Sequence, residues 1–142
     1  MAAYEATSDI QAPAERVWAV LSDVQTWPQW MPTVSSVEPL REMALQVGCR
    51  YRVTQPKLRP TVWVVSVVEA GRRFEWRAKS PGMELVADHV MESTGQGGTR
   101  VRLRFEFRGL VGAFLGAAFG ALTRNYLSQE AQALKDRVEV AM

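Results

Sequence analysis

The sequence has very few of the residues that build metal centres, disulfide frameworks and nucleophilic active sites. Its 142 residues include one cysteine, Cys49, and one histidine, His89. One cysteine cannot form a disulfide within a chain, and these two residues are too few for a zinc site built from cysteine and histidine. The chain also lacks a phosphate-binding loop, a dinucleotide fingerprint and a GxSxG motif. We therefore expect no metal and no cofactor.

Long hydrophobic runs and a strong excess of one charge are missing as well. The longest uncharged stretch, residues 109–123, is shorter than the roughly 20 residues that a membrane span needs. The N-terminus lacks the basic segment and apolar run of a secretory signal. The net charge is only +2, with acidic residues interleaved among the basic ones. We expect a cytoplasmic protein with no stable membrane insertion and no nucleic-acid partner, as a monomer or alternatively a dimer.

The hydrophobic pattern begins as a strand and continues as two short helices. Alternation predicts a strand over residues 1–10, and Pro13 suits the first turn of a helix whose apolar residues Val17 and Leu21 recur at helical spacing. Pro28 and Pro32 keep a second helix, over residues 24–30, short. The sixteen residues VWAVLSDVQTWPQWMP of this region hold three tryptophans, which form either ordinary core or the wall of a cavity.

From Val34 onward the period changes to two, and glycine and proline breakers delimit six further strands. Charged residues occupy one face, which predicts an antiparallel sheet with one face in water. The segment TVWVVSVVE is apolar on both sides, so alternation does not distinguish its two faces. The residues that we assign to the inner face are Cys49, Tyr51, Val53, Trp63, Val65, Val67, Phe74, Trp76, Ala78, Met83, Leu85, Ala87, His89, Met91, Val101, Leu103, Phe105 and Phe107.

After Gly109 the pattern is helical to the end of the chain. Leu127, Ala131, Leu134 and Val138 form an apolar stripe, and the polar residues between them, Glu130 included, are assigned to solvent. The first half instead spaces glycines four residues apart, at Gly112, Gly116 and Gly120. This row favours close packing against the sheet or the short helices. Its alternative role is a soft helix end that gates a cavity.

Five segments in order resemble the START-like helix-grip (SRPBCC) superfamily, in its polyketide cyclase/dehydrase and lipid-transport branch. They are IQAPAERVWAVLSDVQTWPQWMP, QPKLRPTVWVV, FEWRAKSPG, HVMESTGQGGTRVR and YLSQEAQALKDRVE. The resemblance implies one START-like domain over residues 1–142, of the α+β class. It implies a curved seven-stranded antiparallel sheet wrapped around a long C-terminal helix, with two short helices after the first strand. It also implies an internal hydrophobic cavity between sheet and helix.

The resemblance implies binding or transport of a small hydrophobic molecule, such as a lipid, fatty acid, isoprenoid or polyketide. The alternative is a polyketide cyclase or dehydratase, in which His89 and Tyr126 are the catalytic candidates, and a structural role is the third possibility. Gln55, Asn125 and, at the mouth, Arg59 are further polar candidates. The predicted ligand-binding residues are Trp27, Trp30, Met31, Tyr51, Trp63, Trp76, Met83, Leu85, His89, Met91, Phe105, Phe107, Phe114 and Tyr126.

Overall fold

The protein is described by a computed structural model that covers residues 2–40 and 45–140. Seven strands form one antiparallel sheet in the order β1-β7-β6-β5-β4-β3-β2. Neighbouring strands follow one another in the sequence except for β1 and β7, which pair at one edge of the sheet. The strands are β1 (Ala2–Ile10), β2 (Ser36–Pro39), β3 (Arg50–Thr54), β4 (Thr61–Glu69), β5 (Arg73–Ser80), β6 (Met83–Ser93) and β7 (Thr99–Arg108).

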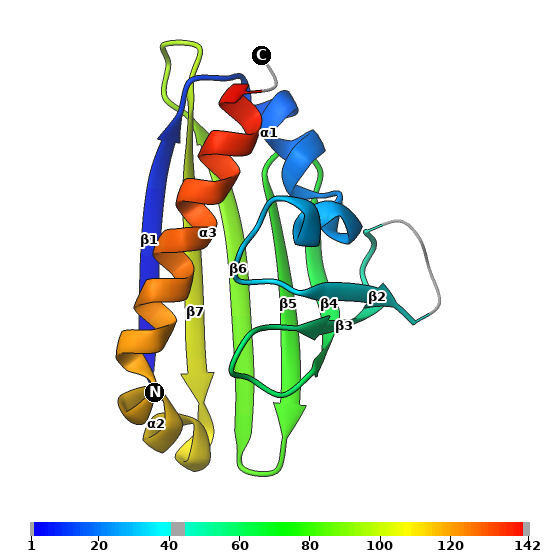
Figure 1. The fold of residues 1–142 in the computed structure, drawn as a ribbon, viewed down its shortest axis with the longest axis vertical. Helices are drawn as coiled ribbons and strands as arrows, with labels where there is room; N and C mark the ends of the chain where they lie inside the picture. The colour runs from blue at the N-terminus through cyan, green and yellow to red at the C-terminus, as the bar shows by residue number, and fades with distance from the viewer. Residues whose placement is uncertain (1, 41–44, 141–142) are drawn as a thin grey trace.

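Four helical segments lie on one side of this sheet. The helix α1 (Ala14–Leu21) and the 3₁₀ helix η1 (Val24–Gln29) follow β1, as the sequence predicted. The C-terminal helix α3 (Gly120–Val140) lies against β1 and β7 and meets α1 near its own C-terminus (Figure 1). The short helix α2 (Gly109–Ala118) sits at the opposite end of α3. The predicted α+β class and curved sheet with a C-terminal helix are confirmed.

Alternation along the strands produces one apolar and one charged face. Residues paired across strands share a face, and the register pairs Tyr51 with Trp63 and Ala87 with both Trp76 and Phe105. These side chains point toward the helices, where the core lies. The inner face of the sheet is therefore aromatic over much of its width.

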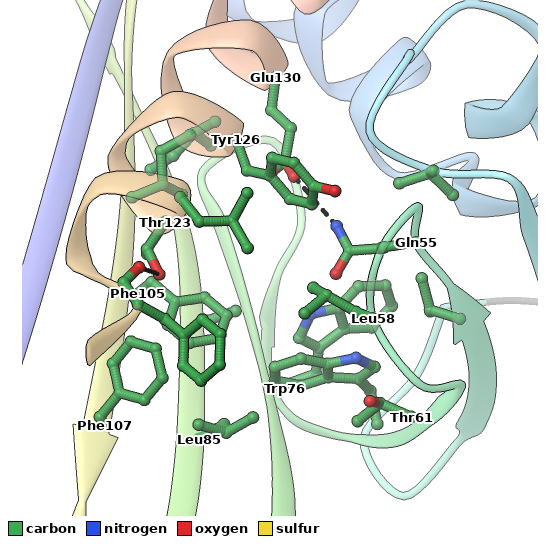
Figure 2. A pocket seen from close by; sticks show the side chains of 18 of the residues that line it. Gln55, Leu58, Thr61, Trp76, Leu85, Phe105, Phe107, Thr123, Tyr126 and Glu130 are labelled. Atoms are coloured by element: carbon green, nitrogen blue, oxygen red, sulfur yellow. Dashed lines mark hydrogen bonds between the residues drawn. The ribbon is translucent and has the colours of Figure 1, made fainter. Parts of the chain in front are cut away.

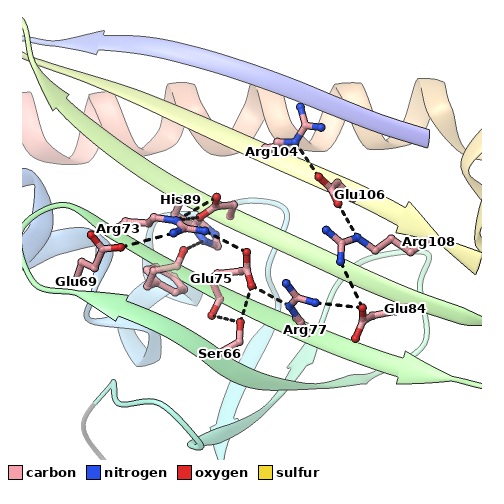
Figure 3. A network of polar contacts seen from close by, with 12 residues as sticks. Ser66, Glu69, Arg73, Glu75, Arg77, Glu84, His89, Arg104, Glu106 and Arg108 are labelled. Carbon is pink, nitrogen blue, oxygen red and sulfur yellow. Dashed lines mark hydrogen bonds and ion pairs between the residues drawn. The ribbon is translucent and has the colours of Figure 1, made fainter. Parts of the chain in front are cut away.

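The opposite face carries a chain of ion pairs (Figure 3). Glu75 is nearly buried there, between Arg73 at 3.2 Å and Arg77 at 2.8 Å, and accepts a hydrogen bond from the Ser66 hydroxyl at 2.8 Å. Burial alone would raise the pKa of Glu75, but the hydrogen bonds from Arg77 and Ser66 outweigh it and the pKa is lowered. Most arginines on this face are thus paired with carboxylates.

An irregularity in β4 corrects one predicted face. The register with β5 shifts between Val65 and Val67, so that Val65 pairs with Trp76 whereas Val67 pairs with Glu75. Val67 therefore shares the charged face, and Val68 packs against the core instead. A one-residue bulge reverses every later side chain of a strand, and a segment apolar on both sides gives no sign of where it occurs.

The predicted single C-terminal helix is two helices separated at Phe119. The glycine row explains how closely both helices pack against β1. A Cβ on Gly116 of α2 would lie 2.6 Å from the Cβ of Ala2, and one on Gly120 of α3 would lie 2.6 Å from the Tyr4 hydroxyl. The Tyr4 hydroxyl also donates to the Gly116 carbonyl at 2.7 Å. Within the described residues, no helix combines the length and hydropathy that crossing a membrane requires.

Candidate functional site: a pocket between the sheet and the C-terminal helix

A pocket of about 340 Å³ lies between the inner face of the sheet and the junction of α2 and α3. Its floor is aromatic and aliphatic, from Trp63 and Trp76 to Leu85 and Phe107 (Figure 2). Pockets for small hydrophobic molecules are concave and mainly apolar, with a few polar groups that orient the ligand. The geometry here meets both conditions, because polar side chains gather at the end next to α3.

The aromatic wall is a packed cluster. The Trp63 and Trp76 rings stack at 5.8 Å with 28° between their planes, and Trp27 lies 5.4 Å from Trp76. The Trp27 indole N–H donates to the Leu21 carbonyl at 3.0 Å, which fixes this ring against α1. Trp18 meets Phe74 edge-on and lies off the pocket wall. The tryptophans of the N-terminal helices therefore divide between wall and core.

His89 is buried among these rings and is neutral at physiological pH. It stacks on Phe74 at 4.0 Å, and its Nδ1 lies 3.2 Å from the Phe74 carbonyl oxygen. Because a carbonyl only accepts, Nδ1 carries the proton and Nε2 is an acceptor. Burial lowers the pKa of His89 to about 4, despite the opposing bond to Phe74. In this tautomer His89 has no proton at Nε2 to polarise a ligand carbonyl.

Glu130 supplies the polar end of the pocket. The Thr33 hydroxyl donates to its Oε2 at 2.9 Å, and the Gln55 amide donates to the same oxygen at 3.5 Å (Figure 2). Burial raises the pKa of Glu130 to about 7, against the effect of these two bonds. Since Oε2 accepts both bonds, the proton of the neutral acid belongs on Oε1. This oxygen makes no hydrogen bond to another residue in the described ranges.

Two indole N–H groups also face the pocket without a partner. Neither Trp63 nor Trp76 donates to another residue within the part of the chain that the structure describes. No fully buried side-chain nitrogen or oxygen of those residues lacks a partner, so both indole nitrogens reach open space. Both side chains are at least 95 % buried and line the pocket, which is therefore that space. Together with neutral Glu130 they offer hydrogen-bond donors to an acceptor inside.

The mouth of the pocket lies between α3 and the loop that connects β3 to β4. The Tyr126 hydroxyl donates to the Pro56 carbonyl, and Leu58 and Arg59 of the same loop line the opening opposite Phe119. The Tyr126 hydroxyl therefore already makes a hydrogen bond to the backbone. Asn125, a further polar candidate, is exposed and accepts a hydrogen bond from the Gln129 amide outside the pocket.

The structure places nine of the predicted ligand-binding residues on the wall of this pocket and five elsewhere. The nine are Trp27, Trp63, Trp76, Met83, Leu85, His89, Phe105, Phe107 and Tyr126. Met31, Tyr51 and Met91 are buried in the core behind the wall, and Trp30 borders a separate hollow against the outer side of α3. Whether any of the nine contacts a ligand stays a prediction.

Phe114 lies farthest from its expected place. Its side chain is 73 % exposed, because Gly112 and Gly116 face the sheet and Phe114 is two residues from each. At about 100° per residue, that spacing puts it on the opposite side of α2. The helical period was clear, but the glycines rather than the large residues form the buried side.

Glu130 is the pocket residue that sequence reasoning missed. It was grouped with the polar residues of α3, yet it lies three residues after Leu127 and four before Leu134, at the edge of the apolar stripe. A carboxylate four residues after Tyr126 on a helix that covers a cavity is the signal that was available. Among the described residues, no cluster of histidine, cysteine and carboxylate side chains is suited to a metal ion.

Comparisons with known proteins agree with this architecture. The family model for polyketide cyclase/dehydrase and lipid transport matches residues 1–139. The chain belongs to this family. No curated protein matches it in sequence.

Solved structures of the START-like fold superpose over nearly the whole chain. The Zhui aromatase/cyclase from a Streptomyces species has a TM-score of 0.78 at 19% identity, over 96% of this chain and 93% of that one. A Thermus thermophilus protein gives 0.77 at 20% identity, over 98% of both chains. A START superfamily protein from Mycobacterium smegmatis gives 0.74 at 16% identity, over 99% of both. At these identities the likeness shows that the START-like fold is shared.

Proposed function

We propose that this member of the polyketide cyclase/dehydrase and lipid transport family binds a small hydrophobic molecule in the pocket under α3. The observation that carries the proposal is the combination of an aromatic wall with a polar end at Glu130. An apolar ligand gains about 25 cal/mol for each Å² that it removes from water. The polar end then fixes which way round the ligand lies.

The donor groups define the ligand further. The Trp63 and Trp76 indoles can only donate, and neutral Glu130 donates from Oε1. A ligand whose polar atoms are acceptors satisfies them, whereas a carboxylate next to Glu130 favours the protonated acid and binds less well as Glu130 ionises. We therefore propose a mainly apolar ligand with neutral acceptor oxygens.

One observation favours an enzyme as the second candidate function. A general acid or base works best when its pKa lies near the working pH, and the pKa of Glu130 is about 7. Among the groups on the wall, Glu130 is better suited than His89, whose imidazole is a weak base with a pKa of about 4. If the protein is a cyclase or dehydratase, we expect Glu130 to transfer the proton and His89 to serve only as a packing residue of the wall.

The pocket is tested by filling it. Ala87 lies on its floor, paired in register with Trp76 and Phe105, so Ala87→Trp places an indole in the space. Ala3→Trp, on the exposed outer side of β1, is the matched control. We expect the neutral probe N-phenylnaphthylamine to fluoresce with wild type and Ala3→Trp but not with Ala87→Trp. Equal binding by all three proteins would refute the pocket assignment.

Native mass spectrometry of freshly purified protein, followed by organic extraction, then identifies any ligand that purifies with it. A stoichiometric apolar molecule supports binding or transport. To test the enzyme alternative, turnover of that molecule is compared between wild type and Glu130→Gln. Binding retained with turnover lost would assign catalysis to Glu130, and no turnover by wild type would exclude that reaction.

A further inference from the structure

The short helix α2 has an unusual distribution of side chains. Its buried residues are Gly112 and Gly116, whereas Leu110 is 91 % exposed and Phe114 is 73 % exposed. Val111 and, just after the helix, Phe119 are each 44 % exposed. A surface helix of a globular protein normally buries its large apolar residues and exposes its polar ones. Here the arrangement is reversed, and α2 has no polar side chain at all.

Helix α2 borders the pocket, because its Leu115 and the following Phe119 line the wall. Phe119 is on the pocket wall, as is Leu58, which is itself 40 % exposed. We call Leu58, Leu110, Val111, Phe114 and Phe119 the mouth patch. The glycine side of α2 packs against β7, so Leu110 and Phe114 are held outward by the fold. Several large apolar residues exposed on one short helix mark a contact site, whereas singly scattered ones do not.

Basic residues surround the mouth patch without acidic neighbours in sequence. Residues 55–61 and 109–129 contain Lys57, Arg59 and Arg124 and no aspartate or glutamate. None of the three forms an ion pair with another described residue, and Arg124 lies over the Tyr4 ring, 4.8 Å from its centre. Most arginines of the outer sheet face, in contrast, are paired with carboxylates. Lys57, Arg59 and Arg124 thus carry positive charge that no described carboxylate neutralises in an ion pair.

We propose that the mouth patch docks on the surface of an anionic lipid bilayer. The large apolar residues of α2 suit the acyl boundary, and Lys57, Arg59 and Arg124 suit the negative headgroups around it. The charged residues within residues 55–61 and 109–129 are all basic, which matches the uniform negative sign of an anionic bilayer surface. The contact is peripheral, and it places the mouth against the lipid, from which an apolar ligand enters without crossing water. Only this last point rests on the proposed function.

Vesicle flotation tests the proposal with the full chain. Wild type is mixed with phosphatidylcholine vesicles, with or without phosphatidylglycerol, and the bound fraction is measured at low and high salt. We expect binding to the vesicles with phosphatidylglycerol, weakened by salt. The double variant Leu110→Ser and Phe114→Ser should bind at least about tenfold less. Val140→Ser, an 84 % exposed valine at the far end of α3, is the apolar control and should bind as wild type does.

The charge variant Lys57→Gln with Arg124→Gln should bind roughly tenfold less or weaker still. Arg16→Gln, an exposed arginine of α1 without an ion pair to a described residue, is its control and should match wild type. Absence of wild-type binding to phosphatidylglycerol vesicles would overturn the proposal. Binding of the Leu110 and Phe114 double variant at the wild-type level would also overturn it. So would a wild-type dimer that dissociates in that variant, since the patch would then contact a second copy of the chain.

The same proteins are titrated with N-phenylnaphthylamine in the absence of vesicles. Leu110 and Phe114 are not on the pocket wall, so the probe should bind their variant as it binds wild type. If wild type binds the probe but not the vesicles, only the docking surface is refuted. If wild type binds the vesicles but not the probe, only the pocket is refuted.

Discussion

Replacing Glu130 with glutamine removes the charge of this side chain and keeps its shape. The glutamine carbonyl oxygen can accept the bonds that the Thr33 hydroxyl and the Gln55 amide now give to Oε2. The variant therefore isolates the cost of holding a carboxylate in the pocket. We expect Glu130→Gln to be more stable than wild type above neutral pH and nearly equal to it in acid.

The magnitude follows from the raised pKa. A rise from 4.5 to about 7 corresponds to roughly 3 kcal/mol of unfavourable interaction for the ionised form. Glu130 is only partly buried and borders the pocket, where water screens it, so we expect about 1–2 kcal/mol. Between these pKa values the folded protein binds more protons than the unfolded chain, so stability falls as the pH rises through this window.

His89 works in the opposite direction over nearly the same range. Its pKa is lowered from 6.5 to about 4 in the folded protein, so the unfolded chain binds more protons and stability falls as the pH drops through that window. The wild-type curve alone would therefore mix two opposed slopes. The difference between variant and wild type at each pH removes the His89 contribution.

The assay is denaturant unfolding of both proteins at several values from about pH 5 to about pH 8. The variant's advantage in free energy of unfolding should grow with pH and level off above the pKa of Glu130. Glu15→Gln, on the exposed surface of α1, is the control and should run parallel to wild type. A constant difference for Glu130→Gln across the range would show that Glu130 does not titrate near neutral pH and would refute the reasoning.

Three further predictions concern other sites. In an NMR titration the His89 ring should stay neutral down to about pH 4, and protonation near 6.5 would contradict its burial. Gly116→Ala should cost about 1–3 kcal/mol in denaturant unfolding, because its Cβ would lie 2.6 Å from Ala2, so an unchanged stability would show that α2 does not pack this closely. Glu75→Ala should lower stability by about 2–3 kcal/mol by leaving Arg73 and Arg77 without their nearly buried partner, and a loss near zero would mean that water replaces it.

Most of the sheet could be predicted from the sequence because its alternation is local information. One face must be apolar and the other wet, so residues two apart share an environment whatever their partners are. The pairing of arginines with carboxylates on the outer face follows from the same period. The assignment failed in β4, where the bulge after Val65 turns Val67 outward and Val68 inward. Since that segment is apolar on both sides, only its pairing with β5 decides the register.

By itself the sequence determined the class of fold, because the order and periodicity of its hydrophobic residues are compatible with one layer of strands under a C-terminal helix. Tertiary structure decided which residues border empty space. Tyr51 and Trp63 are neighbours on the same face, yet one is core and the other is pocket wall. Glu130 has the polarity of a surface residue and Phe114 that of a core residue, but their positions are exchanged. The reason is that a cavity is defined by where packing stops, which depends on the curvature of the sheet and the close approach of α2 through its glycines, and neither is a property of any single segment.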